Sequence, residues 1–330
     1  MRALITSEVG ESWRNLPPDL DVRLCPGTVA GLNGALDETI EILVTDALPD
    51  LVGRGGGLRW VQLLSSGANQ LIGHPFLARG LLASSAAGNC AVHIAEFIAA
   101  RVLGHAKELR TADQLQRHHA WADRLALARP SLRGQCAVLV GYGGVGREAA
   151  RLLAALGMRI IAVTRDGARR PYEGYLPYPD IGDPDAAIPE RIVPTGALAD
   201  VLPEADVVVL TVALTRSTRG LIGAAALDRL RPSAILINVA RGAVIDTPAL
   251  LAALDRGALA HAYLDVFDEE PLPATSPLWA HPGLSITSHM AGVMPDAAQK
   301  LEGLFLENLG RYRRGERLVN QIDAEALQRA

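Results

Sequence analysis

The sequence predicts an α/β protein made of two parallel-sheet domains, one inserted into the other. Its length of 330 residues suggests about two domains of roughly 150 residues each. Continuous runs of Val, Ile and Leu alternate with helical stretches, which is typical of a parallel sheet covered by helices on both faces. A glycine-rich turn of the kind that normally opens a domain begins only at Gly141. Another folded unit is therefore expected in front of it.

Before residue 90, short apolar runs separated by Gly, Pro and Asn turns predict a small α/β unit. The predicted strands are Arg2–Thr6, Val22–Cys25, Glu41–Thr45 and Trp60–Leu64. Two further stretches predict the helices Ala91–Leu109 and Ala112–Leu125. The polar loop 129–135 leads from these helices into the glycine-rich turn.

From that turn onwards, strands and helices alternate regularly. The predicted strands are the run that ends at Val140, then Met158–Thr164, Val207–Val212, Ala234–Val239, Ala260–Asp265 and Leu284–Thr287. The predicted helices are Arg147–Leu156, Gly223–Leu230 and Thr247–Asp255. The Pro- and Gly-rich segment 165–198 is expected to be a loop with one short helix.

The C-terminal part predicts a long amphipathic helix, Pro295–Arg314, followed by an extended tail, Leu318–Asp323. We expect an outer domain made of residues 1–95 and 292–330. Residues 96–291 form the inserted domain that carries the glycine-rich turn.

Composition narrows the function classes. Hydrophobic residues make up 49% of the chain and charged residues 21%, which is ordinary for a soluble globular protein. The formal net charge of −4 gives no indication of a nucleic-acid or anionic-membrane partner. No uncharged run approaches the ~18 apolar residues of a membrane span. The apolar stretch Ala91–Gly104 contains His93, Glu96 and Arg101, so a buried helix is the better interpretation.

The cysteines and the N-terminus predict a cytoplasmic protein. Cys25, Cys90 and Cys136 lie far apart and lack the spacing of metal ligands, so we predict no metal site and expect inert thiols in a reducing compartment. The first residues resemble a β-strand and lack the long apolar core and cleavage site of a signal peptide.

The run from Val138 to Gly146 has the pattern of a strand, a glycine turn and a helix. Gly141 would allow the tight turn, Gly143 would let the backbone approach a pyrophosphate, and Gly146 would let the helix pack closely on the strand. The N–H groups at the start of the helix are then available to phosphates. The pattern predicts a dinucleotide site, and its alternative is a tight turn without a ligand.

Three further segments follow predicted strands and carry reactive side chains. They contain Arg241, Glu270 and His289 respectively. Because ligands of doubly wound sheets bind outside the carboxyl ends of the strands, these side chains are expected beside the dinucleotide. A surface arginine, a solvated acidic loop and a core histidine are each plausible alternatives taken alone. Their convergence at successive strand ends favours an active site.

These segments resemble the D-isomer-specific 2-hydroxyacid dehydrogenase family, in its glyoxylate/hydroxypyruvate reductase-like branch. The resemblance covers nearly the whole chain and rests on the stretches Val140–Gly146, Leu214–Ile222, Ile237–Ile245, Leu264–Leu272 and Thr287–Gly292. It implies a Rossmann-like nucleotide domain inserted into a smaller flavodoxin-like substrate domain, with the active site in a cleft between them. It also implies a homodimer joined largely through the nucleotide domain, including helices near 96–125.

The family resemblance assigns roles to the three side chains. Arg241 would hold the carboxylate of a 2-keto acid and polarise its carbonyl, which suits a permanent cation with several donors. His289 would transfer the proton to or from the substrate oxygen, while hydride moves between nicotinamide C4 and substrate C2. Glu270 would orient the imidazole and favour its charged form.

The resemblance also implies contacts with the coenzyme and the substrate. The expected coenzyme contacts are Gly141, Gly143, Gly144, Val145, Gly146, Thr164, Arg165, Ala240 and Asp265. Asp265 would meet the nicotinamide carboxamide, and its alternative is a turn residue at a strand end. In the outer domain, Ser66 and Gly67 belong to the loop 64–69 whose backbone N–H groups would bind the substrate carboxylate.

The end of the second strand of the nucleotide domain favours NADP(H), with NAD(H) possible. NAD-binding proteins place an acidic residue there to bind the ribose 2′-hydroxyl, but this chain has Thr164 followed by Arg165. Arg169 and Arg170 lie close behind, and an arginine beside a small hydroxyl residue suits a 2′-phosphate. Alternatively, Asp166 supplies the acid or the arginines face solvent.

The predicted substrates are small 2-keto and 2-hydroxy acids. Glu270 separates the chain from the formate dehydrogenase branch, which carries Gln at that position. A preference for NADPH favours reduction of glyoxylate- or hydroxypyruvate-like acids. Leu63, Leu64, Trp279 and Met290 either line the pocket for the substrate side chain or belong to the core. An NAD(P)-sensing binding protein with little turnover is the alternative function, and turnover of 2-keto acids distinguishes the two.

Overall fold

The computed structural model describes residues 1–323 and 327, which form two compact units. The first unit contains Met1–Cys90, the short segment Glu173–Pro179 and the described residues from Met294 onwards. The second unit contains Ala91–Tyr172 and Asp180–Val293. In the sequence, the second unit therefore interrupts the first.

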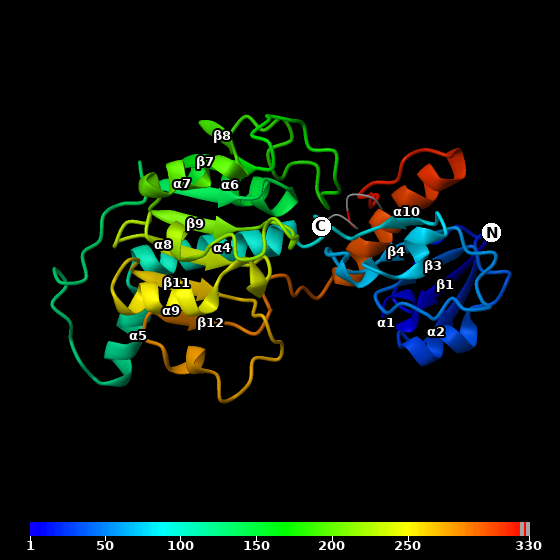
Figure 1. Cartoon of the computed structure of the whole chain (residues 1–330), viewed down its shortest axis with the longest axis horizontal. Helices are drawn as coiled ribbons and strands as arrows, with labels where there is room; N and C mark the ends of the chain where they lie inside the picture. Colours follow the sequence, from blue (N-terminus) through cyan, green and yellow to red (C-terminus); the bar gives the residue numbers. More distant parts are fainter. Residues whose placement is uncertain (324–326, 328–330) are drawn as a thin grey trace. The chain divides into compact units, whose positions relative to one another are not determined.

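The first unit has a five-stranded, all-parallel sheet with the order β2-β1-β3-β4-β5 (Figure 1). This is the flavodoxin-like order 2-1-3-4-5, so the predicted fold of the smaller domain is confirmed. The strands are β1 (Arg2–Thr6), β2 (Asp21–Cys25), β3 (Ile42–Thr45), β4 (Trp60–Leu63) and β5 (Leu82–Ser84). The helices are α1 (Ser7–Gly10), α2 (Val29–Ala35), α3 (Pro75–Ala78) and α10 (Ala297–Arg314), with the 3-10 turn η1 (Asn69–Leu71).

Side chains alternate between the two faces of this sheet, as period-2 strands require. One face contributes buried residues that pack in a single cluster with α2 and Phe76. The other face, which includes Ile5 and Trp60, packs with Leu304 and Phe305 of α10. The rings of Trp60 and Phe305 stack with centroids 5.5 Å apart. The C-terminal helix thus completes the core that the N-terminal strands begin.

The second unit has a seven-stranded, all-parallel sheet with the order β12-β11-β10-β9-β6-β7-β8. Counted within the unit, this order is the Rossmann arrangement 3-2-1-4-5-6 with one strand added, as predicted. The strands are β6 (Cys136–Val140), β7 (Arg159–Thr164), β8 (Arg191–Pro194), β9 (Val207–Leu210), β10 (Ile235–Asn238), β11 (His261–Leu264) and β12 (Leu284–Ile286). The α-helices are α4 (Ala91–Ala106), α5 (Leu109–Arg117), α6 (Gly144–Ala155), α7 (Leu198–Val201), α8 (Ala224–Leu227) and α9 (Thr247–Asp255). The 3-10 turns are η2 (Thr195–Ala197), η3 (Leu202–Glu204), η4 (Gly242–Val244) and η5 (Pro277–Ala280).

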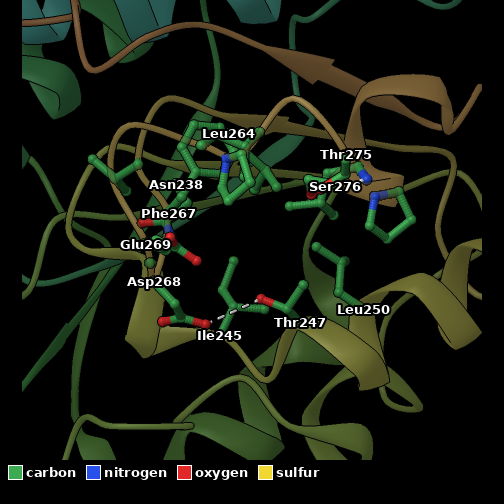
Figure 2. A pocket seen from close by; sticks show the side chains of 16 residues that line it. Asn238, Ile245, Thr247, Leu250, Leu264, Phe267, Asp268, Glu269, Thr275 and Ser276 are labelled. Carbon is green, nitrogen blue, oxygen red and sulfur yellow. Dashed lines mark hydrogen bonds between the residues drawn. The ribbon is translucent and has the colours of Figure 1, made fainter.

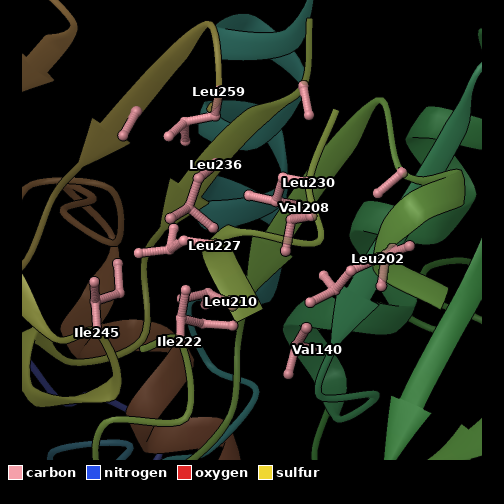
Figure 3. Close-up of a cluster of buried hydrophobic side chains, with 14 of the residues drawn as sticks. Val140, Leu202, Val208, Leu210, Ile222, Leu227, Leu230, Leu236, Ile245 and Leu259 are labelled. Carbon is pink, nitrogen blue, oxygen red and sulfur yellow. The ribbon is translucent and has the colours of Figure 1, made fainter. Parts of the chain in front are cut away.

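Helices cover both faces of this second sheet. On β6, Val138 and Val140 belong to a cluster with α7, α8 and α9, which Figure 3 shows around Leu210, Leu227 and Leu236. The alternate residues of β6, Ala137 and Leu139, belong to the opposite cluster with α4 and α6. Burial on both faces explains why these strands are continuous apolar runs.

Two strands were not predicted from the sequence, and both lie at sheet edges. β5 has three residues, and β8 has four that are half-buried or exposed and end in a proline. β5 is buried but too short to show a pattern, whereas β8 buries little and carries a proline, which edge strands tolerate. The segment 165–198 is therefore less irregular than expected.

The helix predicted over Ala112–Leu125 was placed too far along the chain. α5 begins at Leu109 and ends at Arg117, and the next residues carry no helix. Trp121 and Leu125 fit helical spacing but are exposed within this chain. Without a surface to pack against, helical spacing alone does not stabilise a further turn. From the sequence, Trp121 could either anchor an interface with another chain or belong to the core of this one; its full exposure shows that the core interpretation is wrong. No helix among the described residues is long and apolar enough to cross a membrane.

His261 is a buried histidine at the start of β11, with 5% of its surface exposed. Its Nε2 atom lies 2.9 Å from the Ser285 hydroxyl. Burial, assisted by the positive charge of Arg110 and by the nearby rings of His105 and His281 and by Arg101, lowers the pKa of His261 from 6.5 to about 4. The folded protein therefore excludes a proton that the unfolded chain binds below pH 6.5.

Acidification should destabilise the fold partly through this histidine. Its contribution is complete above pH 6.5 and declines as the pH falls towards 4, by about 2 kcal/mol between pH 7 and pH 5. In urea unfolding of wild type and His261→Asn, we expect the difference in unfolding free energy to change by about that amount over this interval. A difference that stays constant with pH would contradict the assignment.

Candidate active site

The glycine turn after β6 has the geometry of a dinucleotide cradle. Gly141 adopts φ +103°, and a Cβ there would lie 2.8 Å from the Thr211 carbonyl carbon. A Cβ at Gly146 would overlap the carbonyl oxygen of Gly141, so helix and strand require glycine to approach this closely. At Gly143, by contrast, no atom lies within 4 Å of an added Cβ. The open side of the turn thus leaves room for a phosphate.

The helix behind this turn begins at Gly144, three residues earlier than the predicted start at Arg147. Glycines disfavour helix interiors, which is why the sequence suggested a later start. In the first turn, however, the backbone N–H groups lack intrahelical partners. The Gly144 N–H donates to the Tyr172 hydroxyl, and the Val145 N–H is available to an anion. The turn and the helix N-terminus therefore fit the pyrophosphate of a nicotinamide coenzyme.

The end of β7 presents a threonine and one unpaired arginine. The Thr164 hydroxyl accepts a hydrogen bond from the Gly167 amide at 3.0 Å. Arg165 is exposed, and no described residue forms a hydrogen bond or ion pair with its side chain. The guanidinium of Arg170 instead binds both carboxylate oxygens of Asp166, at 3.0 and 2.6 Å. The Arg169 guanidinium donates to the carbonyls of Ala186 and Pro189.

The end of β10 holds Arg241 through its neighbours. The buried Asn238 side chain accepts from the Ala240 amide and donates to the Arg241 carbonyl, each at 3.0 Å. A Cβ on Gly242 would overlap the backbone at Phe267, so this glycine lets the loop after β11 pack closely. Arg241 is half-buried, and its Nη1 donates to the Ala240 carbonyl. The other guanidinium nitrogens of Arg241 are available to a bound carboxylate.

Asp265 holds the loop that carries the histidine. Its carboxylate is 1% exposed and accepts from the Thr287 hydroxyl at 2.6 Å and from the Met290 and Ala291 amides at 2.9 Å. Its carbonyl accepts from the His289 amide at 2.8 Å. Both carboxylate oxygens are thus used within the protein. Contact between Asp265 and the nicotinamide carboxamide stays a prediction.

Glu270 and His289 form a direct pair. Glu270 Oε2 lies 2.7 Å from Nδ1 of His289, and Oε1 accepts from the Phe267 amide at 2.8 Å. Burial alone would raise the pKa of Glu270, but these hydrogen bonds, with the positive charges of His289 and Arg241, lower it below its usual value. The carboxylate therefore stays ionised and holds the imidazole in one orientation.

The other nitrogen of His289, Nε2, forms no hydrogen bond with any described residue, and 49% of the side chain is exposed. A cavity of about 460 Å³ adjoins the pair and is lined by Phe267, Leu272 and Trp279 among others. The Trp279 indole is fixed by donating to the Pro273 carbonyl at 2.9 Å. The imidazole can therefore exchange a proton with a molecule in this cavity. Leu63, which was considered for a substrate pocket, is fully buried in the core of the first unit.

A second cavity, of about 350 Å³, lies between α9 and the loop after β11 (Figure 2). Its walls come from Asn238 and Ile245, from Thr247 and Leu250 of α9, and from Phe267. None of the three reactive side chains lines it. At its rim, the Thr247 hydroxyl of α9 donates to Asp268 Oδ2 of this loop at 3.4 Å.

Ser66 and Gly67 follow β4 in the first unit. The Ser66 hydroxyl donates to the Ala86 carbonyl at 3.3 Å, and the Gly67 carbonyl accepts from the Ser65 hydroxyl at 3.0 Å. The loop is held by these bonds and by the Ser65 N–H, which donates to Asp46 Oδ1 at 2.8 Å; the N–H groups of Ser66 and Gly67 form no hydrogen bond with the described residues.

Sequence reasoning missed a buried polar cluster beside the glycine turn. Tyr142, within the turn, donates from its hydroxyl to Asp183 Oδ2 at 2.6 Å. Arg147, in the first turn of α6, is 5% exposed and donates to carbonyls of the turn and of the segment 170–184. A charged residue directly after the last glycine was the available signal.

A coenzyme cradle and a histidine that can exchange protons, both at the carboxyl edge of one sheet, define a nicotinamide-dependent oxidoreductase. Residues 99–291 match the family described as D-isomer specific 2-hydroxyacid dehydrogenase, NAD binding domain. The chain belongs to the D-isomer specific 2-hydroxyacid dehydrogenase family, and it is an NAD(P)-dependent oxidoreductase that acts on 2-hydroxy acids.

Two similar sequences and one similar solved structure support this family assignment. A glyoxylate reductase from Aeropyrum pernix is 29% identical over 297 residues, which cover 88% of this chain and 84% of the relative. An (S)-sulfolactate dehydrogenase from Chromohalobacter salexigens is 37% identical over 188 residues, 57% of this chain and 56% of the relative. The crystal structure of a D-isomer specific 2-hydroxyacid dehydrogenase from Xanthobacter autotrophicus Py2, in complex with NADPH and MES, matches with a TM-score of 0.82 at 29% identity, covering 98% and 99% of the two chains.

Proposed function

We propose that this enzyme interconverts small 2-keto and 2-hydroxy acids of the glyoxylate or hydroxypyruvate type, with Arg241, Glu270 and His289 as its catalytic machinery. The observation that carries this proposal is the Glu270–His289 pair. One imidazole nitrogen is bound to the carboxylate at 2.7 Å, and the other faces no described partner. That arrangement suits a general acid that protonates a carbonyl oxygen.

In the proposed reduction, the bound coenzyme supplies a hydride to C2 of the keto acid. Arg241 binds the carboxylate of the substrate and draws electron density from its carbonyl. His289 gives its Nε2 proton to the carbonyl oxygen, and Glu270 stabilises the imidazolium before transfer and keeps its orientation. The exposed edge of the imidazole then takes a proton from solvent. Oxidation of the alcohol reverses these steps.

The outer domain is proposed to complete substrate binding. In this proposal residues 1–95 and 292–330 form the substrate domain, and 96–291 the coenzyme domain. Ser66 and Gly67 bind the substrate carboxylate through backbone N–H groups, and Ala240 and Asp265 adjoin the nicotinamide. The support is the position of these residues in the family pattern and the ordered loop after β4.

The proposed coenzyme is NADP(H). At the end of β7, Arg165 is a cation without a partner in the described part of the chain, whereas Asp166, the alternative partner of a ribose hydroxyl, is already bound by Arg170. The hydrogen bond from Arg170 lowers the pKa of Asp166, so this carboxylate stays ionised and paired. The Xanthobacter relative, crystallised with NADPH, gives this preference further support.

Arg165→Gln should reduce kcat/KM with NADPH by about tenfold or more, because a charge-assisted bond to the 2′-phosphate is worth about 1.5–3 kcal/mol. With NADH the value should stay within about twofold, since no 2′-phosphate is present. Arg133→Gln, an exposed arginine before β6 at the opposite edge of the sheet, is the matched control. Equal or better wild-type efficiency with NADH would show the preference to be wrong.

The substrate proposal is tested with a panel of 2-keto acids that contains glyoxylate, hydroxypyruvate, pyruvate and phenylpyruvate. Oxidation of NADPH and of NADH is followed with each acid. A kcat/KM that is highest with glyoxylate and hydroxypyruvate supports the proposal. Tight coenzyme binding without turnover of any acid would instead indicate an NAD(P)-sensing binding protein.

We also propose that the enzyme is a cytoplasmic homodimer joined through residues near 96–125. The Trp121 indole is fully exposed and Leu125 largely so, and large apolar side chains gathered on a surface commonly mark contact with another protein chain. All three cysteines are free thiols, as suits a reducing compartment. Sedimentation equilibrium of wild type and of Trp121→Ser/Leu125→Ser tests the dimer, and cell fractionation tests the location.

A further inference from the structure

Arg147 is a buried cation with unusual partners. Its guanidinium is enclosed in the second unit, yet no described carboxylate lies within ion-pair distance of it. Buried charges are rare without such a partner. Here the charge is met by backbone carbonyls: Nε donates to Tyr142 at 3.1 Å, Nη1 to Asp183 and, at 3.3 Å, to Pro184, and Nη2 to Arg170 at 2.7 Å.

Two aromatic rings and the buried carboxylate of Asp183 complete this cluster. The guanidinium carbon lies 4.9 Å from the ring centroid of Tyr142 and 5.3 Å from that of Tyr172, within the range of cation–π attraction. The Asp183 carboxylate accepts from the Tyr142 hydroxyl and, at 2.8 and 3.0 Å, from the amides of Ala187 and Ile188. The buried charges of Arg147 and Asp183 are thus both met by hydrogen bonds within the second unit.

Two of the carbonyls that Arg147 binds belong to two parts of the proposed coenzyme site. Tyr142 lies within the glycine turn that faces the pyrophosphate, and Arg170 ends the segment 165–170 that follows β7. At its other end, this segment is fixed by the hydrogen bond from the Gly167 amide to the Thr164 hydroxyl. Arg165, the free cation, lies between the two anchors.

We propose that Arg147 is a positioning residue for coenzyme selectivity: it fastens the segment 165–170 to the glycine turn, so that Arg165 is held ready for a 2′-phosphate. The inference rests on the proposed NADP(H) preference. Without the fastening, the segment keeps only its other contacts, those of Arg169 and Thr164, and is less ordered before the coenzyme binds. The entropic cost of ordering it then falls on the contacts that the segment makes with the coenzyme. The phosphates bound by the glycine turn should be affected much less.

The test compares Arg147→Met, Arg147→Lys and the wild type in calorimetric titrations with adenosine 2′,5′-bisphosphate and with adenosine 5′-monophosphate. These probes lack nicotinamide, so binding is measured whether or not the enzyme turns over. Arg159→Met is the matched control, because that arginine is exposed at the opposite end of β7. Thermal melting reports whether each variant is folded.

We expect Arg147→Met to weaken the bisphosphate about tenfold and the monophosphate less than about threefold. Arg147→Lys should lie between, since one ammonium cannot reach all the carbonyls, and it remains informative if the methionine variant does not fold. Steady-state kinetics should show a higher KM for NADPH with little change in kcat.

Equal weakening of both probes would mean that Arg147 only stabilises the fold, and unchanged binding of both would mean that the fastening has no role in selectivity. Either result overturns the inference and leaves the proposed coenzyme standing. A wild type that does not distinguish the probes would overturn the NADP(H) preference and the inference together.

Discussion

Replacing His289 with glutamine is expected to lower kcat for reduction of a 2-keto acid by about three orders of magnitude, because a positioned general acid contributes about 10²–10⁴-fold. Glutamine retains a donor but cannot transfer a proton near neutral pH. The pair with Glu270 is the only hydrogen bond of this side chain to the part of the chain that the structure describes. The substitution should therefore leave the fold intact and reduce the chemical step.

Two comparisons make this result specific. His281→Gln removes another histidine paired with a carboxylate, Asp255 at 3.2 Å, away from the cavity beside His289, and should keep wild-type kcat. Fluorescence titration with NADPH should give the same affinity for wild type and His289→Gln, since the coenzyme cradle is untouched. A His289→Gln enzyme with kcat within about tenfold of wild type would be incompatible with the assigned role.

Replacing Arg241 with glutamine should reduce kcat/KM by about 10³-fold, equivalent to about 4 kcal/mol of transition-state stabilisation. The loss has two parts: the carboxylate of the substrate loses a forked, charge-assisted contact, and its carbonyl loses a nearby positive charge. Both KM and kcat should therefore change. Arg241→Lys should recover part of the loss, because lysine keeps the charge but not the fork.

Arg256→Gln is the control for this substitution, since Arg256 is an exposed arginine paired with Asp228. Coenzyme affinity should again remain close to wild type. A change in KM alone, with kcat unaffected by Arg241→Gln, would restrict Arg241 to binding the substrate carboxylate. An unchanged kcat/KM would remove it from the active site.

The sequence was sufficient to predict the architecture, because its strongest hydrophobic patterns belong to the strands that build the sheets. Strands buried on both faces, such as β6 and β9, are unbroken apolar runs, and their positions were predicted to within two residues. The edge strand β8 carries no such signal, since half of its surface faces solvent. Helix boundaries were less accurate: α6 begins at Gly144 instead of Arg147, and α5 ends at Arg117 instead of Leu125.

In the site, too, some contacts could be predicted from the sequence and others could not. Glu270 and His289 were predicted to interact, and the structure places their side-chain atoms 2.7 Å apart. The buried contacts of Asp265 and Arg147 could not be predicted, because their partners are backbone amides and carbonyls that every residue possesses. Such contacts depend on the path of the chain, which residue types alone do not specify.

The helix α10 has a consequence for how the chain folds as it is made. Trp60 and the other side chains on that face of the first sheet are synthesised early, whereas Leu304 and Phe305, which cover them, come more than two hundred residues later. At about 5–20 residues per second, that face stays uncovered for roughly 12–50 s. The interrupting unit, whose strands and helices are contiguous, can fold during this time. One face of the first sheet therefore stays uncovered until α10 has left the ribosome.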